Sequence, residues 1–121
     1  MIYTPLQLNA GCPPGQNQTF NSLRPDGTTV PFALPAGSKF ALTDISVVIA
    51  NIGSATPILV QVGIRQVLGS GHVQRWNFAG YTIQNVERSF KTPIMFSTNF
   101  ELWNVSNTAD LNVNIFGYMT I

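Results

Sequence analysis

Apolar and polar residues alternate along residues 57–65, and this segment is the clearest strand signal in the chain. A period of two residues places successive side chains on opposite faces of a strand. One face of the segment is therefore expected to be buried, while the other faces outward. The inward positions are Ile58, Val60, Val62 and Ile64, and the outward positions are Leu59, Gln61, Gly63 and Arg65.

Residues 39–50 carry a second strong strand signal, and its phase changes part-way. The apolar positions have one parity up to Leu42 and the other parity from Ile45 onward. One extra residue in a strand shifts every following side chain by one position, so the change predicts a β-bulge or a bend near Thr43 and Asp44. The apolar positions concerned are Phe40, Leu42, Ile45, Val47 and Ile49.

Weaker strand signals fill the rest of the chain, and turns rich in proline or glycine separate them. No segment keeps the period of an amphipathic helix, which leaves an all-β fold. Because no helices are available for crossovers, the strands must pair mainly antiparallel. Further strands are expected at 18–23, 28–34, 73–81, 85–90, 94–96, 100–105 and 111–121, with breaks at 24–27, 35–37, 51–56, 68–72 and 91–93.

The number and spacing of these strands predict an antiparallel β-sandwich, in the first place a jelly roll of about eight strands. An immunoglobulin-like sandwich is the alternative. The jelly roll is expected to span residues 35–121. Residues 1–34 hold five of the eight prolines, and proline cannot donate to a sheet ladder. This first part is therefore expected to be an irregular arm or a set of edge strands.

The composition indicates a subunit of an assembly. Charged residues make up only 9% of the chain, whereas hydrophobic residues make up 45%. An ordinary domain carries about 25% charged residues, and a small domain needs charge to stay soluble as a monomer. We therefore expect other subunits to cover much of the surface. The net charge of +1 gives no general attraction to nucleic acid or to an anionic membrane.

The last segment, 111–121, indicates where such a subunit contact would lie. Its expected core positions are Leu111, Val113, Ile115, Met119 and Ile121. The opposite face carries two aromatic residues among amides, which is typical of a covered surface. The segment 100–105 also has apolar residues on both faces. The predicted interface residues are Asn112, Asn114, Phe116, Tyr118 and Trp103.

Two segments of the chain resemble known jelly rolls. They are the entry Pro35-Ala36-Gly37-Ser38-Lys39-Phe40-Ala41-Leu42-Thr43-Asp44 and the exit that runs from Asn104 to Gly117-Tyr118. In their order they are similar to jelly rolls of the tumour necrosis factor and complement C1q type. They are also similar to small jelly-roll cement or decoration proteins of tailed bacteriophage capsids. The resemblance covers residues 35–121 and concerns an architecture.

This resemblance implies a homotrimer in which Phe116 and Tyr118 face the neighbouring subunits at the three-fold axis. It also implies a non-enzymatic virion structural protein that decorates a capsid and stabilises the shell by binding the major capsid protein. Such a protein would be assembled in the host cytoplasm and would lie on the capsid surface, without a nucleic-acid or membrane partner. Residues 1–34 have no counterpart in the resemblance, and as an arm specific to this protein they are expected to lie extended on the shell.

The residue inventory argues against an enzyme. His72 is the only histidine, so a histidine-based metal site would need carboxylates to complete it. A catalytic triad would also need His72, and no nucleophile-elbow motif is present in the sequence. The single cysteine, Cys12, excludes an intrachain disulfide and is expected to be an inert turn thiol. We expect no catalytic residue, no metal and no cofactor.

The alternative function is a carbohydrate-binding module or a small oligomeric lectin. Binding sites for small molecules combine aromatic surface with a few converging polar groups, and this chain is rich in asparagine and glutamine. The candidate contacts for a glycan or another partner are Arg75, Trp76 and Tyr81, with Trp103 as a further platform.

Overall fold

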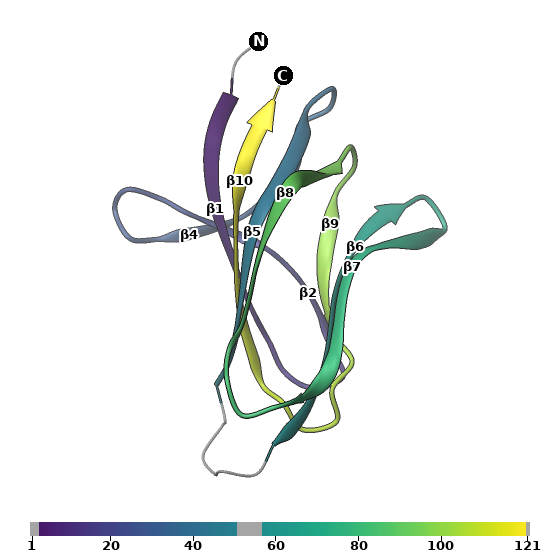
Figure 1. Cartoon of the computed structure of the whole chain (residues 1–121). Helices are drawn as coiled ribbons and strands as arrows, with labels where there is room; N and C mark the ends of the chain where they lie inside the picture. Colours follow the sequence, from purple (N-terminus) through teal and green to yellow (C-terminus); the bar gives the residue numbers. More distant parts are fainter. Residues whose placement is uncertain (1–2, 51–56, 121) are drawn as a thin grey trace.

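The computed structural model describes residues 3–50 and 57–120, without the side chains of Tyr3 and Leu23. These residues form ten β-strands in two antiparallel sheets that pack as a β-sandwich (Figure 1). Within these ranges no helix could cross a membrane. The strands are β1 (Tyr3–Cys12), β2 (Asn17–Thr19), β3 (Asn21–Leu23), β4 (Thr29–Pro31), β5 (Lys39–Ile49), β6 (Ile58–Leu68), β7 (Gly71–Thr82), β8 (Val86–Phe96), β9 (Phe100–Asn104) and β10 (Leu111–Thr120).

The strand order follows a jelly roll. The six-stranded sheet has the order β4-β3-β1-β10-β5-β8, and the four-stranded sheet has the order β2-β9-β6-β7. β1 pairs with β10, β2 with β9, β5 with β8 and β6 with β7, each antiparallel. The chain is therefore one long antiparallel ribbon that folds over and divides its strands between two sheets. These paired strands confirm the predicted antiparallel jelly roll.

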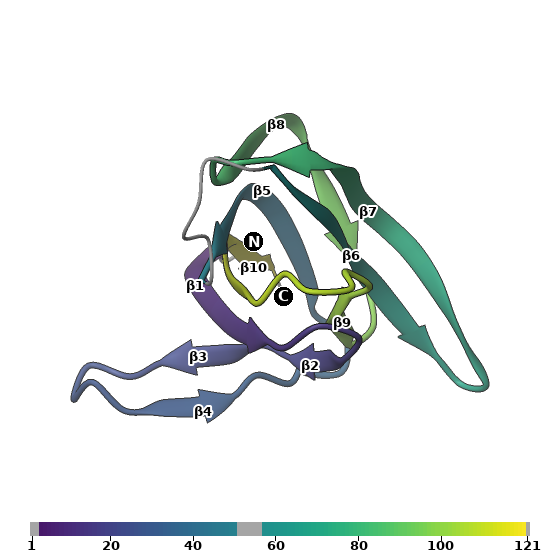
Figure 2. The same cartoon turned by 90° about the horizontal axis from the view of Figure 1, so that it is seen from below.

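β3 and β4 are additional to this ribbon and form a hairpin that extends the six-stranded sheet beyond β1 (Figure 2). Its turn was expected at residues 24–27, and Gly27 closes it with a φ of 88°. Asp26 accepts hydrogen bonds at Oδ1 from the backbone N–H of Thr28 at 3.0 Å and from its hydroxyl at 2.6 Å. These bonds favour the ionised carboxylate and lower the pKa of Asp26.

Residues 3–34 form strands of the sandwich. β1 pairs along its whole length with β10 and lies inside the six-stranded sheet, where Leu8, Ala10 and Cys12 are buried. Pro5 lies opposite Tyr118 of β10 in a part of β1 that β3 does not reach, since β3 pairs with β1 only at Leu8 and Asn9, so one side of β1 is open there. The region therefore forms strands and not a detached arm, but only β2 and β4 are edge strands, since β1 and β3 lie inside the six-stranded sheet.

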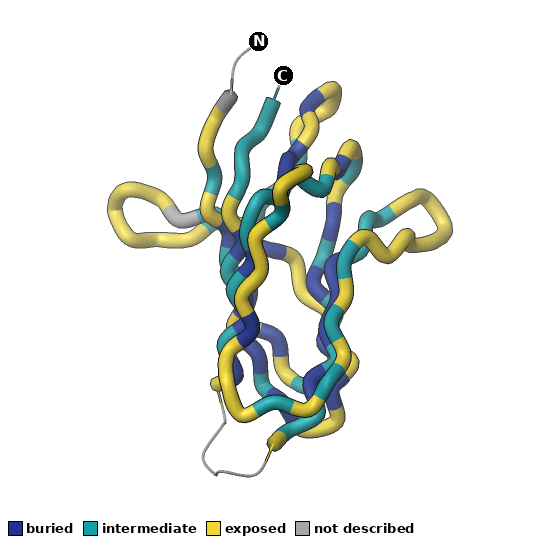
Figure 3. Tube along the Cα trace, viewed as in Figure 1, coloured by how far each residue is buried: buried dark blue, intermediate teal, exposed yellow. Residues whose placement is uncertain are grey.

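The core between the sheets contains a group of phenylalanine rings. Phe40 and Phe100 stack with their ring centroids 5.3 Å apart, and Phe96 lies 4.6 Å from Phe100. Such pairs add about 0.5–1.5 kcal/mol to the stability gained from burial alone. Buried residues line the inner faces of both sheets (Figure 3). The predicted inward positions Val60, Val62, Ile64, Leu111, Val113 and Ile115 are buried, whereas Ile58 and Met119 are half-buried.

The predicted bulge in β5 is present at Thr43. Both neighbours of β5 skip this residue, since Phe116 of β10 pairs with Asp44 and Gly117 pairs with Leu42. The bulge returns the apolar residues on either side to one face of the sheet. For that reason Phe40, Leu42, Ile45, Val47 and Ile49 are all buried in the same core.

Two expected breaks take a different form from the one the sequence indicated. At 91–93 β8 itself continues through Pro93 at the edge of the sheet, but its pairing with β5 is interrupted, since Ser89 pairs with Asp44 and the next pair is Ile94 with Leu42. The turn expected at 68–72 contracts to Gly69 and Ser70, because β6 and β7 pair as far as Leu68 and Gly71. The expected loop 51–56 and the expected core position Ile121 lie outside the described residues.

A buried asparagine fixes the end of the sandwich where β1 and β9 finish. Asn104 is fully buried, and its amide donates to the carbonyl oxygens of Cys12 at 2.9 Å and Ala109 at 2.8 Å. Its side-chain oxygen accepts from the backbone N–H of Ser106 at 3.0 Å. The side chain therefore satisfies polar groups of three segments that would otherwise be buried without partners.

Candidate functional site

The outer face of the six-stranded sheet contains four of the five predicted interface residues. Asn112, Asn114, Phe116 and Tyr118 alternate along β10 with the buried core positions and so face outward. Phe116 is exposed and Tyr118 is half-buried. The two central strands of this sheet, β1 and β10, carry no charged residue. The centre of the face is thus aromatic and neutral.

Asparagine side chains on this face bond to one another. The Asn9 amide on β1 donates to Oδ1 of Asn112 at 2.7 Å and to Oδ1 of Asn114 at 2.9 Å on β10. Each bond satisfies a polar group within the face itself. Covering such a surface costs less desolvation than covering unpaired or charged groups.

The bulge at Thr43 in β5 contacts the β10 backbone at Phe116. The Thr43 hydroxyl lies 3.1 Å from the carbonyl oxygen of Phe116 and 2.8 Å from Oδ2 of Asp44. A β-carbon at Gly117 would lie only 1.9 Å from the carbonyl oxygen of Ala41, so this position requires glycine. The close approach of β10 to β5 holds the aromatic pair at fixed positions on the face.

A shallow depression of about 230 Å³ lies beside Phe116, between β5, β8 and β10. Asp44 and Glu87 line it together with Arg88 and Ser89. The Ser89 hydroxyl donates to Oδ1 of Asp44 at 2.6 Å, and this bond, followed by that from Thr43, lowers the pKa of Asp44. The charged residues that line this depression therefore lie on β5 and β8, and Asp44 is paired opposite Phe116.

Trp103, the fifth predicted interface residue, lies on the opposite side of the molecule. It belongs to β9, whose neighbouring positions Leu102 and Asn104 are buried, so Trp103 faces outward from the four-stranded sheet. The guanidinium carbon of Arg65 lies 3.7 Å from the centroid of its ring. Trp103 and Phe116 therefore cannot belong to one flat contact.

A group of polar side chains that the sequence analysis missed surrounds Trp103. Arg65 donates to Oε1 of Glu101 from Nε at 2.7 Å and from Nη2 at 2.6 Å. Asn17 donates to the same oxygen at 3.2 Å, and Nε2 of His72 lies 3.3 Å from it. These residues come from four different strands, so no local sequence signal could have grouped them. The charges of this face neutralise one another.

The four-stranded face also has a depression of about 170 Å³. Its polar lining is made of amides, and Val105 and Ala79 supply apolar surface. Gly63 leaves room for the Gln74 side chain, because a β-carbon there would lie 1.7 Å from Nε2 of Gln74. The amide residues are Gln61, Gln74 and Asn77.

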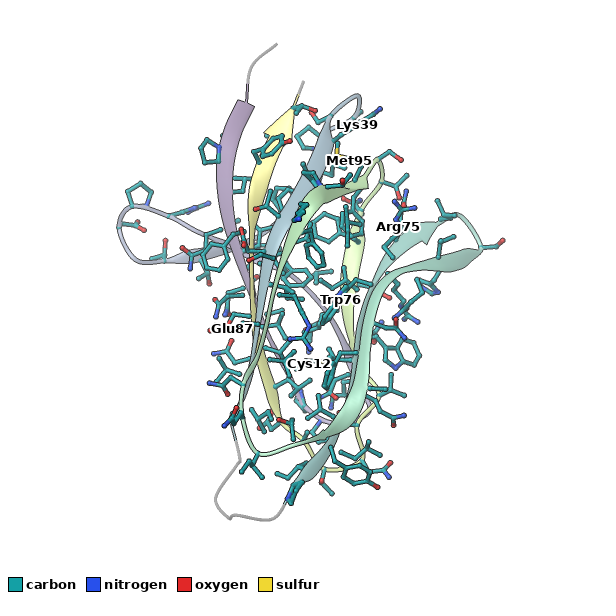
Figure 4. The ribbon with its side chains drawn as sticks, in the orientation of Figure 1. Cys12, Lys39, Arg75, Trp76, Glu87 and Met95 are labelled. Carbon is teal, nitrogen blue, oxygen red and sulfur yellow. The ribbon has the colours of Figure 1, made fainter. Side chains whose placement is uncertain are left out.

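The three predicted glycan contacts on β7 do not share a face. Trp76 packs against the core and lies between the two sheets (Figure 4), whereas Tyr81 faces outward and is 74% exposed. Arg75 is the extra residue where the pairing of β6 with β7 shifts, and it donates to the carbonyl oxygen of Met95 at 3.1 Å. The structure therefore separates the aromatic platform that the sequence suggested.

The described residues contain no group of three or more His, Cys, Asp or Glu that could hold a metal ion. Cys12 is the last residue of β1 and is buried, whereas the sequence analysis placed it in a turn. Burial raises the pKa of its thiol, which donates to the carbonyl oxygen of Gln16 at 3.1 Å. The thiol is therefore protonated and shielded at neutral pH.

Compared with known proteins, the chain matches no family model and no curated sequence.

Proposed function

We propose that the chain is a non-enzymatic structural protein that forms a homotrimer through the outer face of the six-stranded sheet. The observation that carries the proposal is the neutral centre of this face, where Phe116 and Tyr118 stand among paired asparagines. Interface cores are depleted in charge and enriched in aromatic residues. A face of this kind loses little hydration when a second copy covers it.

The proposed trimer decorates and cements a larger shell, and we place it on the capsid surface of a virion, bound to the major capsid protein. This part rests on the resemblance of residues 35–121 to small capsid decoration proteins and on the low charge of the chain, 9%. Such a role needs stable packing and no catalytic group. The hairpin β3–β4, which projects from the sandwich, is available to reach a neighbouring shell subunit (Figure 2).

The trimer contact is tested with variants on the two outer faces. We expect Tyr118→Asp to dissociate the trimer, because it places an unpaired charge in a desolvated contact. Phe116→Lys is a second variant at an exposed position and is expected to have the same effect. The matched control is Val105→Asp on the four-stranded face. Sedimentation velocity that shows the same assembly for all three variants would remove this face from the interface.

Carbohydrate binding is the second candidate function, and the amide-lined depression on the four-stranded face favours it. Gln61, Gln74 and Asn77 present donors and acceptors beside Val105, a combination that suits neutral hydroxyl groups next to apolar ring faces. We expect Asn77→Ala to abolish glycan-array binding without changing the assembly state. An array on which the wild-type protein binds no glycan would contradict this function.

A further inference from the structure

The four edge strands of the two sheets differ in how well they are protected. An edge strand offers unpaired backbone groups to another strand, and proteins block it by shortness, proline or charge. β2 and β4 have three residues each, and β4 ends in Pro31. β8 is long but carries Glu87, Arg88, Lys91 and Pro93. Three of the four edges therefore use a recognised form of protection.

β7 is the least protected edge, because its only protecting feature is the bulge at Arg75. It has twelve residues, contains no proline, lysine or acidic residue, and pairs on one side only, with β6, among the described strands. Its one arginine, Arg75, donates to the carbonyl oxygen of Met95 on β8. Its charge is therefore directed toward β8 and not along the open side of β7. The pairing shift at Arg75 leaves residues 76–82 as a regular strand with an open side.

The same hairpin concentrates exposed apolar side chains. The described residues expose seven large hydrophobic side chains, and four of them lie on β6–β7 or directly after it. They flank both ends of β7: Leu68 and Val73 near its start, and Tyr81 and Ile83 near its end. An antiparallel partner of the same sequence would bring the start of one strand beside the end of the other.

We propose that β7 pairs antiparallel with β7 of a second copy of this chain, so that the two four-stranded sheets become continuous across a two-fold axis. Centring the regular stretch 76–82 on Ala79 places Asn77 opposite Tyr81 and Phe78 opposite Gly80. Each pair lies on one face of the joined sheet. The Phe78 ring already lies 3.3 Å from the β-carbon position of its own Gly80, so the glycine in each pair is covered. Arg75 then faces Ile83, so no like charges oppose each other.

This contact is distinct from the proposed trimer, because β7 belongs to the sheet opposite to Phe116. A two-fold contact between copies that already meet about a three-fold axis gives a closed assembly of six chains when the two axes meet at right angles. Each contact is also able to exist without the other. The experiments below therefore distinguish failure of the β7 pairing from failure of the trimer.

Disulfide trapping tests the pairing directly. The native Cys12 is buried, so an introduced cysteine is the accessible thiol among the described residues. We expect mild oxidation to link most of the Ala79→Cys protein into pairs, with Asn77→Cys and Tyr81→Cys covering the neighbouring registers. Thr29→Cys on the protected edge β4 is the control and is expected to stay unlinked. The absence of linked pairs in all three β7 variants would overturn the proposal.

Sedimentation in the Phe116→Lys background separates the two contacts. There we expect a two-chain mass, which Ala79→Lys reduces to one chain and Thr29→Lys leaves unchanged. A single-chain mass for Phe116→Lys beside a trimeric wild type would overturn the β7 pairing and leave the trimer standing. A two-chain mass for both the wild type and Phe116→Lys would support the β7 pairing and overturn the trimer.

Discussion

The two outer faces of this sandwich differ in where their charged side chains lie and in how these are paired. The six-stranded face keeps charge away from its centre, where amides pair with amides and Phe116 stays exposed. The four-stranded face keeps its charges and neutralises them locally, since Arg65 and Glu101 bond beside Trp103. The centre of the first face, β1 and β10, carries no ion, and Asp44 lies beside it on β5 opposite Phe116, whereas covering the second face would dehydrate the ion pair of Arg65 and Glu101. The first face is therefore the better surface for a subunit contact.

The largest effect is expected from removing the strand that forms half of the neutral centre. Deleting residues 1–12 takes away β1 and with it the buried Leu8, Ala10 and Cys12. It also leaves β10 unpaired on one side, so we expect the chain not to fold. Near-ultraviolet circular dichroism and thermal unfolding check this. A truncated chain that still unfolds cooperatively would show that β1 is an attached arm.

The next largest effect on stability is expected at the end of the sandwich where β1 and β9 finish. Asn104→Ala removes the amide that satisfies Cys12 and Ala109, and we expect a loss of about 3 kcal/mol, since several buried polar groups lose their partners. Asn107→Ala, at an exposed position nearby, is the control and should change little. Urea unfolding measures both. Equal midpoints for the two variants would refute the role of Asn104.

A smaller effect is expected on the four-stranded face. Glu101→Ala leaves Arg65, whose side chain is only 12% exposed, without its carboxylate, and we expect a loss of about 2 kcal/mol. The matched variant on the other sheet is Glu87→Ala, an exposed position where we expect a change below about 0.5 kcal/mol. Equal changes in the free energy of unfolding for both substitutions would contradict a stabilising role of the Arg65–Glu101 pair on the four-stranded face.

The smallest effect is a titration on the six-stranded face. The folded protein lowers the pKa of Asp44, so this group contributes stability above its unfolded pKa of 3.8, and the contribution disappears as the pH falls through the folded pKa. We expect Ser89→Ala to move the pKa of Asp44 upward, toward that value. NMR titration measures it, with Asp26 in the same spectra as the unchanged reference. An Asp44 pKa unaffected by Ser89→Ala would contradict the assigned bond.

The alternation of apolar and polar residues within single strands was enough to predict the bulge in β5 and the buried face of β6. The parity change at Thr43 was enough to place the bulge, and the alternation in residues 57–65 identified the buried face of β6. β1 was missed because Pro5 argues against a strand. Only the pairing of the folded chain reveals that β3 does not reach this part of β1, which leaves one side of the strand open at Pro5.

The candidate site was predictable on one face and not on the other. The four predicted interface residues on β10 lie on one face, because alternation within a single regular strand fixes the direction of their side chains. The contact of Arg65 with Glu101 joins residues 36 positions apart and depends on the pairing of β6 with β9. The grouping of Trp76 with Tyr81 failed for a simpler reason, since residues five positions apart on a regular strand face opposite ways.

The central claim is that the neutral face of the six-stranded sheet is a contact between copies of this chain. The most direct test is the solution mass of the wild-type protein, measured by light scattering after size exclusion over a range of concentrations. The account predicts about three times the chain mass of 13.2 kDa, or twice that when trimers pair through β7. A mass of 13.2 kDa at every concentration would contradict it, because the neutral face would then be free.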